Sequence, residues 1–211
     1  MRNDLIIDFE TMSTDETNCA VIDCAAFVFD WDRFTSDNPY TMKDIVNMKR
    51  FKLDVKDQVQ TNGYSVDKST LKFWSDQSEA VRKRISPKSG DLSVDGFASE
   101  FLAFLADGPK IEYWWSRSNA FDPVIMFRLF RDADMSNNLA QYLHFWRVRD
   151  TRTHIDAKFD YTTQNGFVPV GDEAFWEKIF QAHNSSWDIL ADVLRLQAIK
   201  RAEEDLEQVQ R

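Results

Sequence analysis

Three short stretches of the sequence carry acidic residues at spacings that suit catalysis, and the first lies near the N-terminus. Asp8 and Glu10 follow an aliphatic run at residues 5–7. Alternate side chains of a strand share a face, so both carboxylates would point to one spot. Two ionised carboxylates held that close repel each other, and a hard divalent cation such as Mg²⁺ relieves the repulsion. The stretch therefore predicts a cation site, although two hydrated acids at a strand end explain an isolated D-x-E without any chemistry.

The second stretch is centred on Asp122, which follows a polar loop and opens an expected helix. An acid in the first turn is also a routine partner of the helix dipole. Its position favours a further role, because the expected strand at residues 110–116 would lie beside the first strand of such a sheet. The exit of that strand would deliver Asp122 next to Asp8.

The third stretch contains His183 and Asp188, five residues apart. On one continuous helix these side chains would be turned roughly 140° from each other. His183 is therefore expected on the loop before a helix, with Ser185 or Ser186 as N-cap and Asp188 in the first turns. A histidine there can act as a general base near neutral pH. In the alternative reading, His183 is a loop residue and Asp188 a dipole partner, and Asp192, one turn on, is a rival carboxylate.

The overall composition limits the kinds of partner. The 211 residues are 43% hydrophobic and 14% aromatic, enough for one domain over residues 1–211. The formal charge of -9 argues against a protein that coats nucleic acid through a broad basic surface. Any contact with nucleic acid must then be local, or assisted by bound cations.

Cysteine content and hydropathy bear on the compartment. Cys19 and Cys24 lie in an apolar run that reads as a strand, where they would point to opposite faces and lie too far apart for a disulfide. We expect a reducing, cytoplasmic compartment. No apolar stretch is long enough for a signal peptide or a membrane span, so no membrane partner is expected.

The elements that must position these residues follow from hydrophobic periodicity. Three strands come first and are joined closely enough for an antiparallel meander; they are expected at residues 5–10, 19–31 and 45–55. Strands and helices then alternate, with strands at 110–116 and 145–148 and helices at 69–85, 94–107, 121–135 and from about Ser186. Residues 158–175 read as a loop. This order predicts an α/β protein whose mixed sheet is covered by helices.

Taken in order, the three stretches resemble the DEDDh 3'-5' exonucleases of the ribonuclease-T-like, ribonuclease-H-like superfamily. The motifs of that family are D-x-E, then Phe or Tyr followed by Asp, then H-x4-D. The matching residues here are Asp8, Glu10, Phe121, Asp122, His183 and Asp188. The resemblance implies a ribonuclease-H-like mixed five-stranded sheet, with a three-strand antiparallel meander, two parallel strands and helices on both faces.

Other residues are similar to one branch of the family, the small phage and bacterial enzymes with T-even-like phage exonuclease A and a mycobacterial-type exoribonuclease. Residues 69–80 resemble its Ser-x-x-Thr-Leu-x-Trp-Trp-x-x-Gln signature, with Phe73 at the first Trp. In the second motif, Ser116 and Ser118 stand where that branch has glycines.

The resemblance implies a site with two Mg²⁺ or Mn²⁺ ions. Asp8 would bridge both ions, Glu10 and Asp188 would complete the first, and Asp122 would hold the second. His183 would be the general base. The implied activity is hydrolysis of single-stranded DNA or RNA from the 3' end to nucleoside 5'-monophosphates, in a bacterial or phage-infected cell. Phage relatives suggest DNA and mycobacterial relatives suggest RNA, and we favour DNA.

Candidate substrate contacts lie near these motifs. Thr11 and Met12 follow the first motif, where relatives hold the terminal nucleotide, and Phe73 and Trp74 could stack on bases. At helical spacing, however, Trp74 is more often a core residue than a stacking platform. Arg117 precedes the second motif and is a local cation.

Alternatives stay open at this point. A catalytically silent nucleic-acid-binding module, an exoribonuclease of the same family and a ribonuclease-H-like endonuclease share these motifs. No local motif reports on a 2'-hydroxyl, so DNA and RNA are not discriminated. The aromatic content would suit a homodimer interface. Whether Asp192 assists Asp188 is also open.

Overall fold

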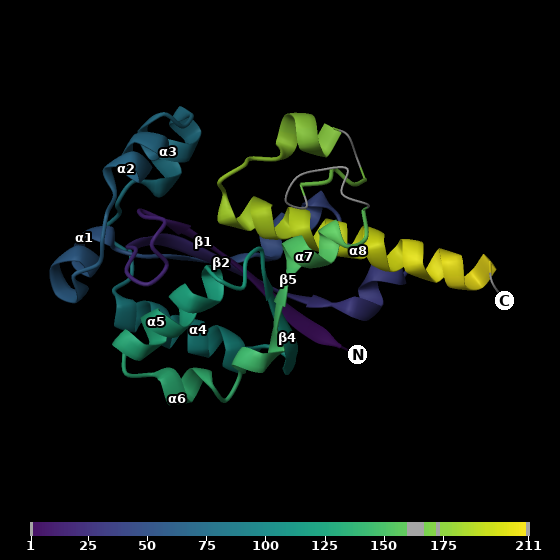
Figure 1. Ribbon diagram of the computed structural model, residues 1–211, viewed down its shortest axis with the longest axis horizontal. Helices are drawn as coiled ribbons and strands as arrows, with labels where there is room; N and C mark the ends of the chain where they lie inside the picture. The colour runs from purple at the N-terminus through teal and green to yellow at the C-terminus, as the bar shows by residue number, and fades with distance from the viewer. Residues whose placement is uncertain (1, 160–166, 172–173, 210–211) are drawn as a thin grey trace.

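The structure is a computed structural model, which describes residues 2–159, 167–171 and 174–209. A five-stranded sheet runs through it in the order β3-β2-β1-β4-β5 (Figure 1). β1 pairs antiparallel with β2 and β2 with β3, whereas β4 is parallel to β1 and β5. The strands are β1 (Asn3–Thr11), β2 (Val21–Asp30), β3 (Lys49–Lys52), β4 (Ile111–Ser116) and β5 (Val148–Asp150). The predicted mixed sheet, with a meander and two parallel strands, is confirmed.

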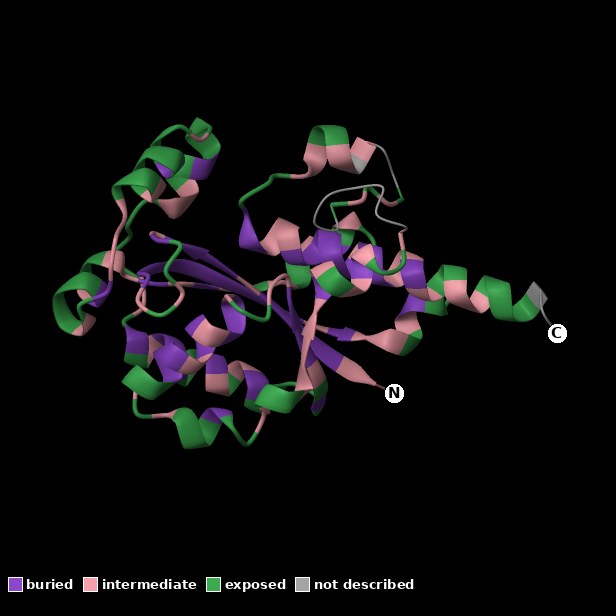
Figure 2. Cartoon of the chain, viewed as in Figure 1, coloured by how far each residue is buried: buried purple, intermediate pink, exposed green. Residues whose placement is uncertain are grey.

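Helices cover both faces of the sheet, whose strands are largely buried (Figure 2). α4 (Val94–Asp107) and α5 (Asp122–Asp132) pack on one face, and α8 (Ser185–Val209) lies across the other. α2 (Lys68–Ser75) and α3 (Glu79–Ile85) form an arm beside the end of β1 (Figure 1). The shorter helices are α1 (Val55–Asp57), α6 (Ser136–Leu139) and α7 (Thr151–Asp156).

The side chains of β1 alternate between two hydrophobic cores. Ile7 and Phe9 belong to the core beneath α4 and α5, whereas Ile6 belongs to the core beneath α8. Because alternate residues share a face, Asp8 and Glu10 lie on the α8 side of the sheet. The N-terminal part of α8 can therefore reach both acids.

Two of the predicted strands were misplaced. The strand expected at 45–55 is shorter, because Met42–Asn47 forms a 3-10 helix that a Thr41–Asp44 capping box starts. The strand expected at 145–148 begins later, since Phe145–Arg147 is a 3-10 turn and β5 follows it. In both places, residues whose apolar character had suggested a strand form a tight helical turn.

The helix expected at 69–85 is two helices. α2 ends at Ser75, and the hydroxyl of Ser78 accepts a hydrogen bond from the Val81 backbone N–H to start α3. Ser78 is thus an internal N-cap. Leu71, on α2, is exposed.

The expectation that Cys19 and Cys24 face opposite sides was wrong. Both thiols are free and buried in the core beneath α4 and α5. Cys19 lies outside β2, and the pairing of β1 with β2 shifts register between Glu10 and Thr11. That irregularity breaks the alternation on which the prediction relied.

Half of the loop expected at 158–175, residues 160–166 and 172–173, lies outside the described residues. Residues 167–171 belong to no helix or strand, as expected, and a π-helix at Phe175–Ile179 begins where the expected loop ends. Within the described part of the chain, no helix combines the length and apolar character required to cross a bilayer.

Candidate active site

The acidic site forms where β1 ends under the start of α8. Asp8, Glu10 and Asp188 each offer a carboxylate oxygen, and these oxygens all lie within 4.8 Å of one another. Two of the acids come from alternate positions of one strand and the third from a helix 178 positions further along the chain than Glu10. The structure thus brings together the first and third predicted motifs.

Asp122 approaches the same place from the opposite side of β1. β4 runs parallel to β1, and the chain leaves it through a short loop into α5, whose first residue is Asp122 with Pro123 behind it. The backbone N–H of Phe9 donates to Asp122 Oδ1 at 3.0 Å. Asp122 is therefore fixed to the backbone between Asp8 and Glu10, although it lies outside the group of three oxygens.

Asp188 belongs to the first turn of α8 and caps it. The backbone N–H of Asn184, the residue before the helix, donates to Asp188 Oδ2 at 3.0 Å. The predicted N-caps, Ser185 or Ser186, were both wrong, because α8 begins at Ser185 and both residues lie inside it. The hydroxyl of Ser185 donates to Asp23 Oδ1 at 2.6 Å.

The four carboxylates disfavour one another's charge. Burial, then the nearby Asp122 and Glu10, raises the pKa of Asp8 well above its usual range. Burial and Asp23 do the same to the pKa of Glu10. Burial raises the pKa values of Asp122 and Asp188 to about 7. The donors are all carboxylate oxygens, so a hard divalent cation such as Mg²⁺ or Mn²⁺ fits the group and would remove this penalty.

His183 lies in the loop before α8, as predicted, with its backbone in the left-handed region at φ 58°. Its ring makes an edge contact with Phe73 at 4.8 Å and lies 6.3 Å from the Trp74 ring. Partial burial, followed by the charge of Arg84, lowers the pKa of His183. The imidazole is therefore neutral near pH 7 and able to accept a proton.

Asp192, the rival carboxylate, is engaged elsewhere. Its Oδ1 accepts from Arg117 and Arg195, and its Oδ2 accepts from the Thr151 hydroxyl at 2.6 Å. Arg117, a predicted substrate contact, thus forms an ion pair with a buried acid. The reason for this pairing is electrostatic, since a buried carboxylate requires a paired cation.

A groove of about 420 Å³ opens beside Glu10 between the end of β1 and α2. Its lining combines aromatic rings with hydroxyl-bearing side chains and one acid: Phe9, Glu10, Thr11, Ser13, Thr14, Ser69, Thr70, Phe73, Trp74 and Phe121. Phe73, a predicted stacking residue, is 38% exposed and free to meet a ligand. Trp74 is only 4% exposed and donates its indole N–H to the Thr11 carbonyl at 2.8 Å, so it mainly anchors α2. Met12 packs against the cores and does not line the groove.

Two acids outside the motifs support the site: Asp23, which is buried, and Asp150, which is partly buried. Asp23 lies on β2 opposite Glu10 and has no exposed surface. Its position within an apolar strand was the signal that sequence reasoning passed over. Asp150 accepts from the backbone N–H groups of Asn119 and Thr153, so it fixes the loop before Asp122 to the start of α7.

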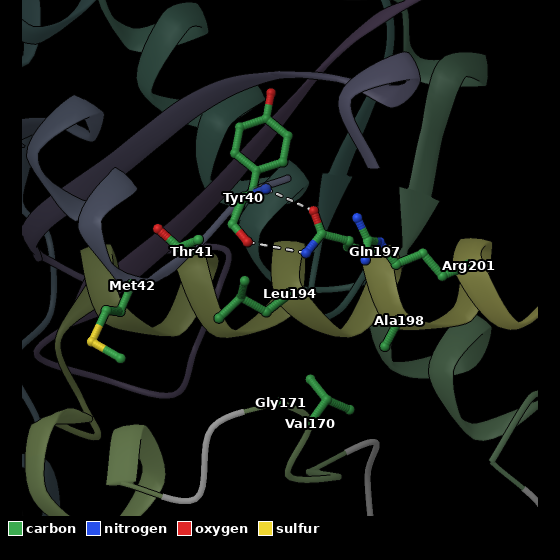
Figure 3. Close-up of a pocket in the computed structure, with 9 residues that line it drawn as sticks. All are labelled: Tyr40, Thr41, Met42, Val170, Gly171, Leu194, Gln197, Ala198 and Arg201. Atoms are coloured by element: carbon green, nitrogen blue, oxygen red, sulfur yellow. Dashed lines mark hydrogen bonds between the residues drawn. The ribbon is translucent and has the colours of Figure 1, made fainter. Parts of the chain in front are cut away.

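A second cavity, of about 410 Å³, lies along α8 (Figure 3). Its walls include Met42, Leu194 and Ala198, and the Gln197 amide is bound to both backbone groups of Tyr40. Leu194, the first residue of α8 in the cavity lining, lies nearly two turns beyond Asp188, and none of the clustered acids lines the cavity. The cavity is therefore separate from the acidic group.

Comparison with known proteins also indicates a nuclease. Residues 3–185 match the family described as the 3'-5' exoribonuclease Rv2179c-like domain. An exodeoxyribonuclease of Enterobacteria phage T4 is 33% identical over 214 residues, which cover 92% of this chain and 87% of the relative.

Solved structures of E. coli exonuclease I share the fold. The zinc-bound complex with single-stranded DNA superposes with a TM-score of 0.63 at 15% identity, over 99% of this chain and 42% of that one. The complex with a dT13 oligonucleotide gives 0.62 at 14% identity, over 99% and 43%. The chain thus spans about two fifths of the length of exonuclease I. On the family match and the phage relative, the chain belongs to this family of 3'-5' exonucleases.

Proposed function

We propose that the protein is a metal-dependent exonuclease that hydrolyses single-stranded nucleic acid from the 3' end and releases nucleoside 5'-monophosphates. The observation that carries this proposal is the convergence of four carboxylates from β1, α5 and α8 beside a neutral histidine. Such a group is costly without cations and suited to phosphoryl chemistry with them.

Two Mg²⁺ or Mn²⁺ ions are the proposed cofactors. Asp8, Glu10 and Asp188 would hold one, and Asp8 with Asp122 would hold the other. The bound cations would neutralise the scissile phosphate and support in-line attack by water. Their charge also explains how a chain of net charge -9 could accept a polyanion at this place.

The protein's own groups would complete the reaction. His183 would take the proton of the attacking water, and the contact with Phe73 would hold its ring. The groove beside Glu10 would hold the terminal nucleotide, with Phe73 against the base and the hydroxyl-bearing Thr11 and Ser69 in the lining. Stacking of this kind tolerates any base.

The preferred nucleic acid is proposed to be DNA. The phage relative, at 33% identity, is an exodeoxyribonuclease, and this supports DNA as substrate. The family description names an exoribonuclease, which keeps RNA as the second candidate. Initial rates on single-stranded DNA and RNA oligonucleotides of the same sequence decide between them.

The test of activity uses an oligonucleotide labelled at its 3' end. Release of labelled mononucleotide with Mg²⁺, and its loss in Asp8→Asn, is the expected result. Asp76→Asn is the matched control, since Asp76 is an exposed acid paired with Lys72 on α2. No release from DNA or RNA by the folded, metal-loaded protein would contradict the proposal and favour a silent binding module. Internal cuts on a 3'-blocked substrate would instead identify an endonuclease.

Light scattering at assay concentration tests the predicted homodimer. A mass near twice 24.7 kDa is the expected result.

A further inference from the structure

We propose that Arg84 of α3 is a positioning residue for His183, holding the histidine loop in place from the α2–α3 arm through the buried acid Asp23. This role rests on the proposed function, in which His183 is the general base. Arg84 lies 99 positions before His183 in the chain, and its side chain joins the two segments directly.

Asp23 is the fixed point of this arrangement. It lies on β2 opposite Glu10 and is completely buried. Arg50 from β3 and Arg84 from α3 both pair with its Oδ2, and Ser185 at the start of α8 donates to its Oδ1. One carboxylate thus ties the sheet, the arm and the first turn of α8 together, directly beneath the histidine loop.

The two terminal nitrogens of the Arg84 guanidinium have different partners. Nη1 lies 3.4 Å from Asp23 Oδ2, whereas Nη2 donates to the backbone carbonyl of His183. His183 has φ 58°, a left-handed conformation that is unfavourable for a residue with a β-carbon. A hydrogen bond to its carbonyl is a direct way to maintain that conformation, since it fixes the peptide that follows His183.

The same arm also contacts the histidine ring. Phe73 on α2 meets the ring edge-on, and the neighbouring Trp74 is anchored to the Thr11 carbonyl at the end of β1. The arm therefore holds the backbone of His183 through α3 and its ring through α2. Because α2 also forms one wall of the groove, the terminal nucleotide and the base would be positioned by the same pair of helices.

The charges around the loop make this role measurable. Arg84 faces the loop from α3, Glu10 lies on β1 within the field of Arg84, and Asp188 binds the residue after His183 from α8. The groups that α2 presents to the ring are the uncharged Phe73 and Trp74. Arg84 is the charged group that lowers the pKa of His183, so its removal should raise that pKa.

The experiment compares Arg84→Gln with Arg84→Lys and with Lys83→Gln, an exposed charge on the same helix. For Arg84→Gln we expect kcat to fall by about tenfold or more with KM within about twofold, because the base is misplaced while the groove remains. The acidic limb of its kcat profile should move to higher pH. Arg84→Lys keeps the charge and should restore the position of that limb, and Lys83→Gln should match the wild type.

A second measurement does not depend on turnover. The chain has three histidines, so the ring protons of His183 can be followed by NMR titration after assignment with His183→Ala. Arg84→Gln should raise the titration midpoint of His183, and Lys83→Gln should leave it unchanged. Thermal unfolding identifies variants that fail to fold, and Asp23 keeps Arg50 and Ser185 in Arg84→Gln.

The outcomes separate the two proposals. An inactive wild type would contradict the proposed function, and the NMR titration would still test the contact. Wild-type kcat, pH profile and His183 midpoint in Arg84→Gln would overturn the positioning role. A lower melting temperature with unchanged kcat and midpoint would also overturn it, since a merely structural arginine behaves in that way.

Discussion

Asp188 and Asp192 lie one turn apart on α8 in opposite electrostatic surroundings, so the same substitution should have opposite effects on them. Asp188 faces other acids, and burial raises its pKa to about 7. Asp192 faces Arg117 and Arg195. We expect Asp188→Asn to remove activity and stabilise the metal-free protein, and Asp192→Asn to destabilise it while the folded molecules retain activity.

The magnitude for Asp192 follows from its partners. The side chains of Arg117 and Arg195 are 14% and 4% exposed, and Asp192 forms an ion pair with both. Removing the carboxylate charge takes this buried partner from two adjacent guanidiniums, and breaking a buried pair costs about 3–5 kcal/mol. For a chain of this length the melting temperature should fall on the order of 10 °C.

The effect for Asp188 has the opposite sign. Its pKa is raised from 3.8 to about 7 in the folded state, so the folded protein binds the proton more tightly than the unfolded chain does. The stability linked to that proton is present below pH 3.8 and is lost as the pH rises through about 7. The difference between the two pKa values corresponds to about 4 kcal/mol of stability, and partial solvent exposure reduces this free energy to about 1–2 kcal/mol. At pH 8 in EDTA, the free energy of unfolding of Asp188→Asn should exceed that of the wild type by that amount.

The assay is urea unfolding in EDTA at pH 5 and pH 8, together with turnover in Mg²⁺. Asp76→Asn again controls for the substitution itself. The gain in Asp188→Asn should be full at pH 8 and less than half as large at pH 5, because only part of the linked stability is lost at pH 5. The turnover of this variant should fall on the order of a hundredfold or more. If Asp192→Asn lost turnover with full stability, or Asp188→Asn lost stability in EDTA at pH 8, the assignment of roles on α8 would be refuted.

Three further predictions follow from the site. Mg²⁺ should raise the melting temperature of the wild type at pH 8 and leave that of Asp8→Asn almost unchanged, because binding to the folded state stabilises it; equal shifts in scanning calorimetry would place the cation elsewhere. His183→Ala should lower kcat by about 10²–10⁴-fold with little change in KM, and it should remove the acidic limb of the pH profile. In the wild type that limb should lie below the usual histidine pKa of 6.5, because burial lowers the pKa of His183. Phe73→Ala should raise KM for oligonucleotides by about tenfold, corresponding to about 1–3 kcal/mol of stacking, while Phe73→Tyr keeps the wild-type value in steady-state assays.

The parts of the site that obey local rules could be predicted from the sequence. Strand alternation is enough to place Asp8 and Glu10 on one face. The separation of five residues excluded a continuous helix through His183 and Asp188, and the structure indeed has His183 in the loop. The position of Asp122 required only that a parallel strand follow the meander.

Contacts between segments far apart in the sequence could not be predicted from local rules. The pairing of Arg84 with Asp23 joins α3 to β2, and neither residue has a periodicity or spacing that indicates the other. The register shift after Glu10 placed Cys19 and Cys24 in one core, although alternation predicted opposite faces. A bulge depends on the partner strand, which a single stretch of sequence does not specify.

The start of α8 links metal binding to the proposed base. Asp188 has an oxygen in the acidic group, and its Oδ2 accepts a hydrogen bond from the backbone N–H of Asn184, which directly follows His183. Asp122 is arranged similarly, since its Oδ1 accepts a hydrogen bond from the backbone N–H of Phe9. Cations that draw these carboxylates together would therefore act on the same turn that Arg84 holds from the other side. The histidine loop should consequently be more ordered in the metal-loaded protein, and hydrogen exchange at Asn184 should slow when Mg²⁺ is added.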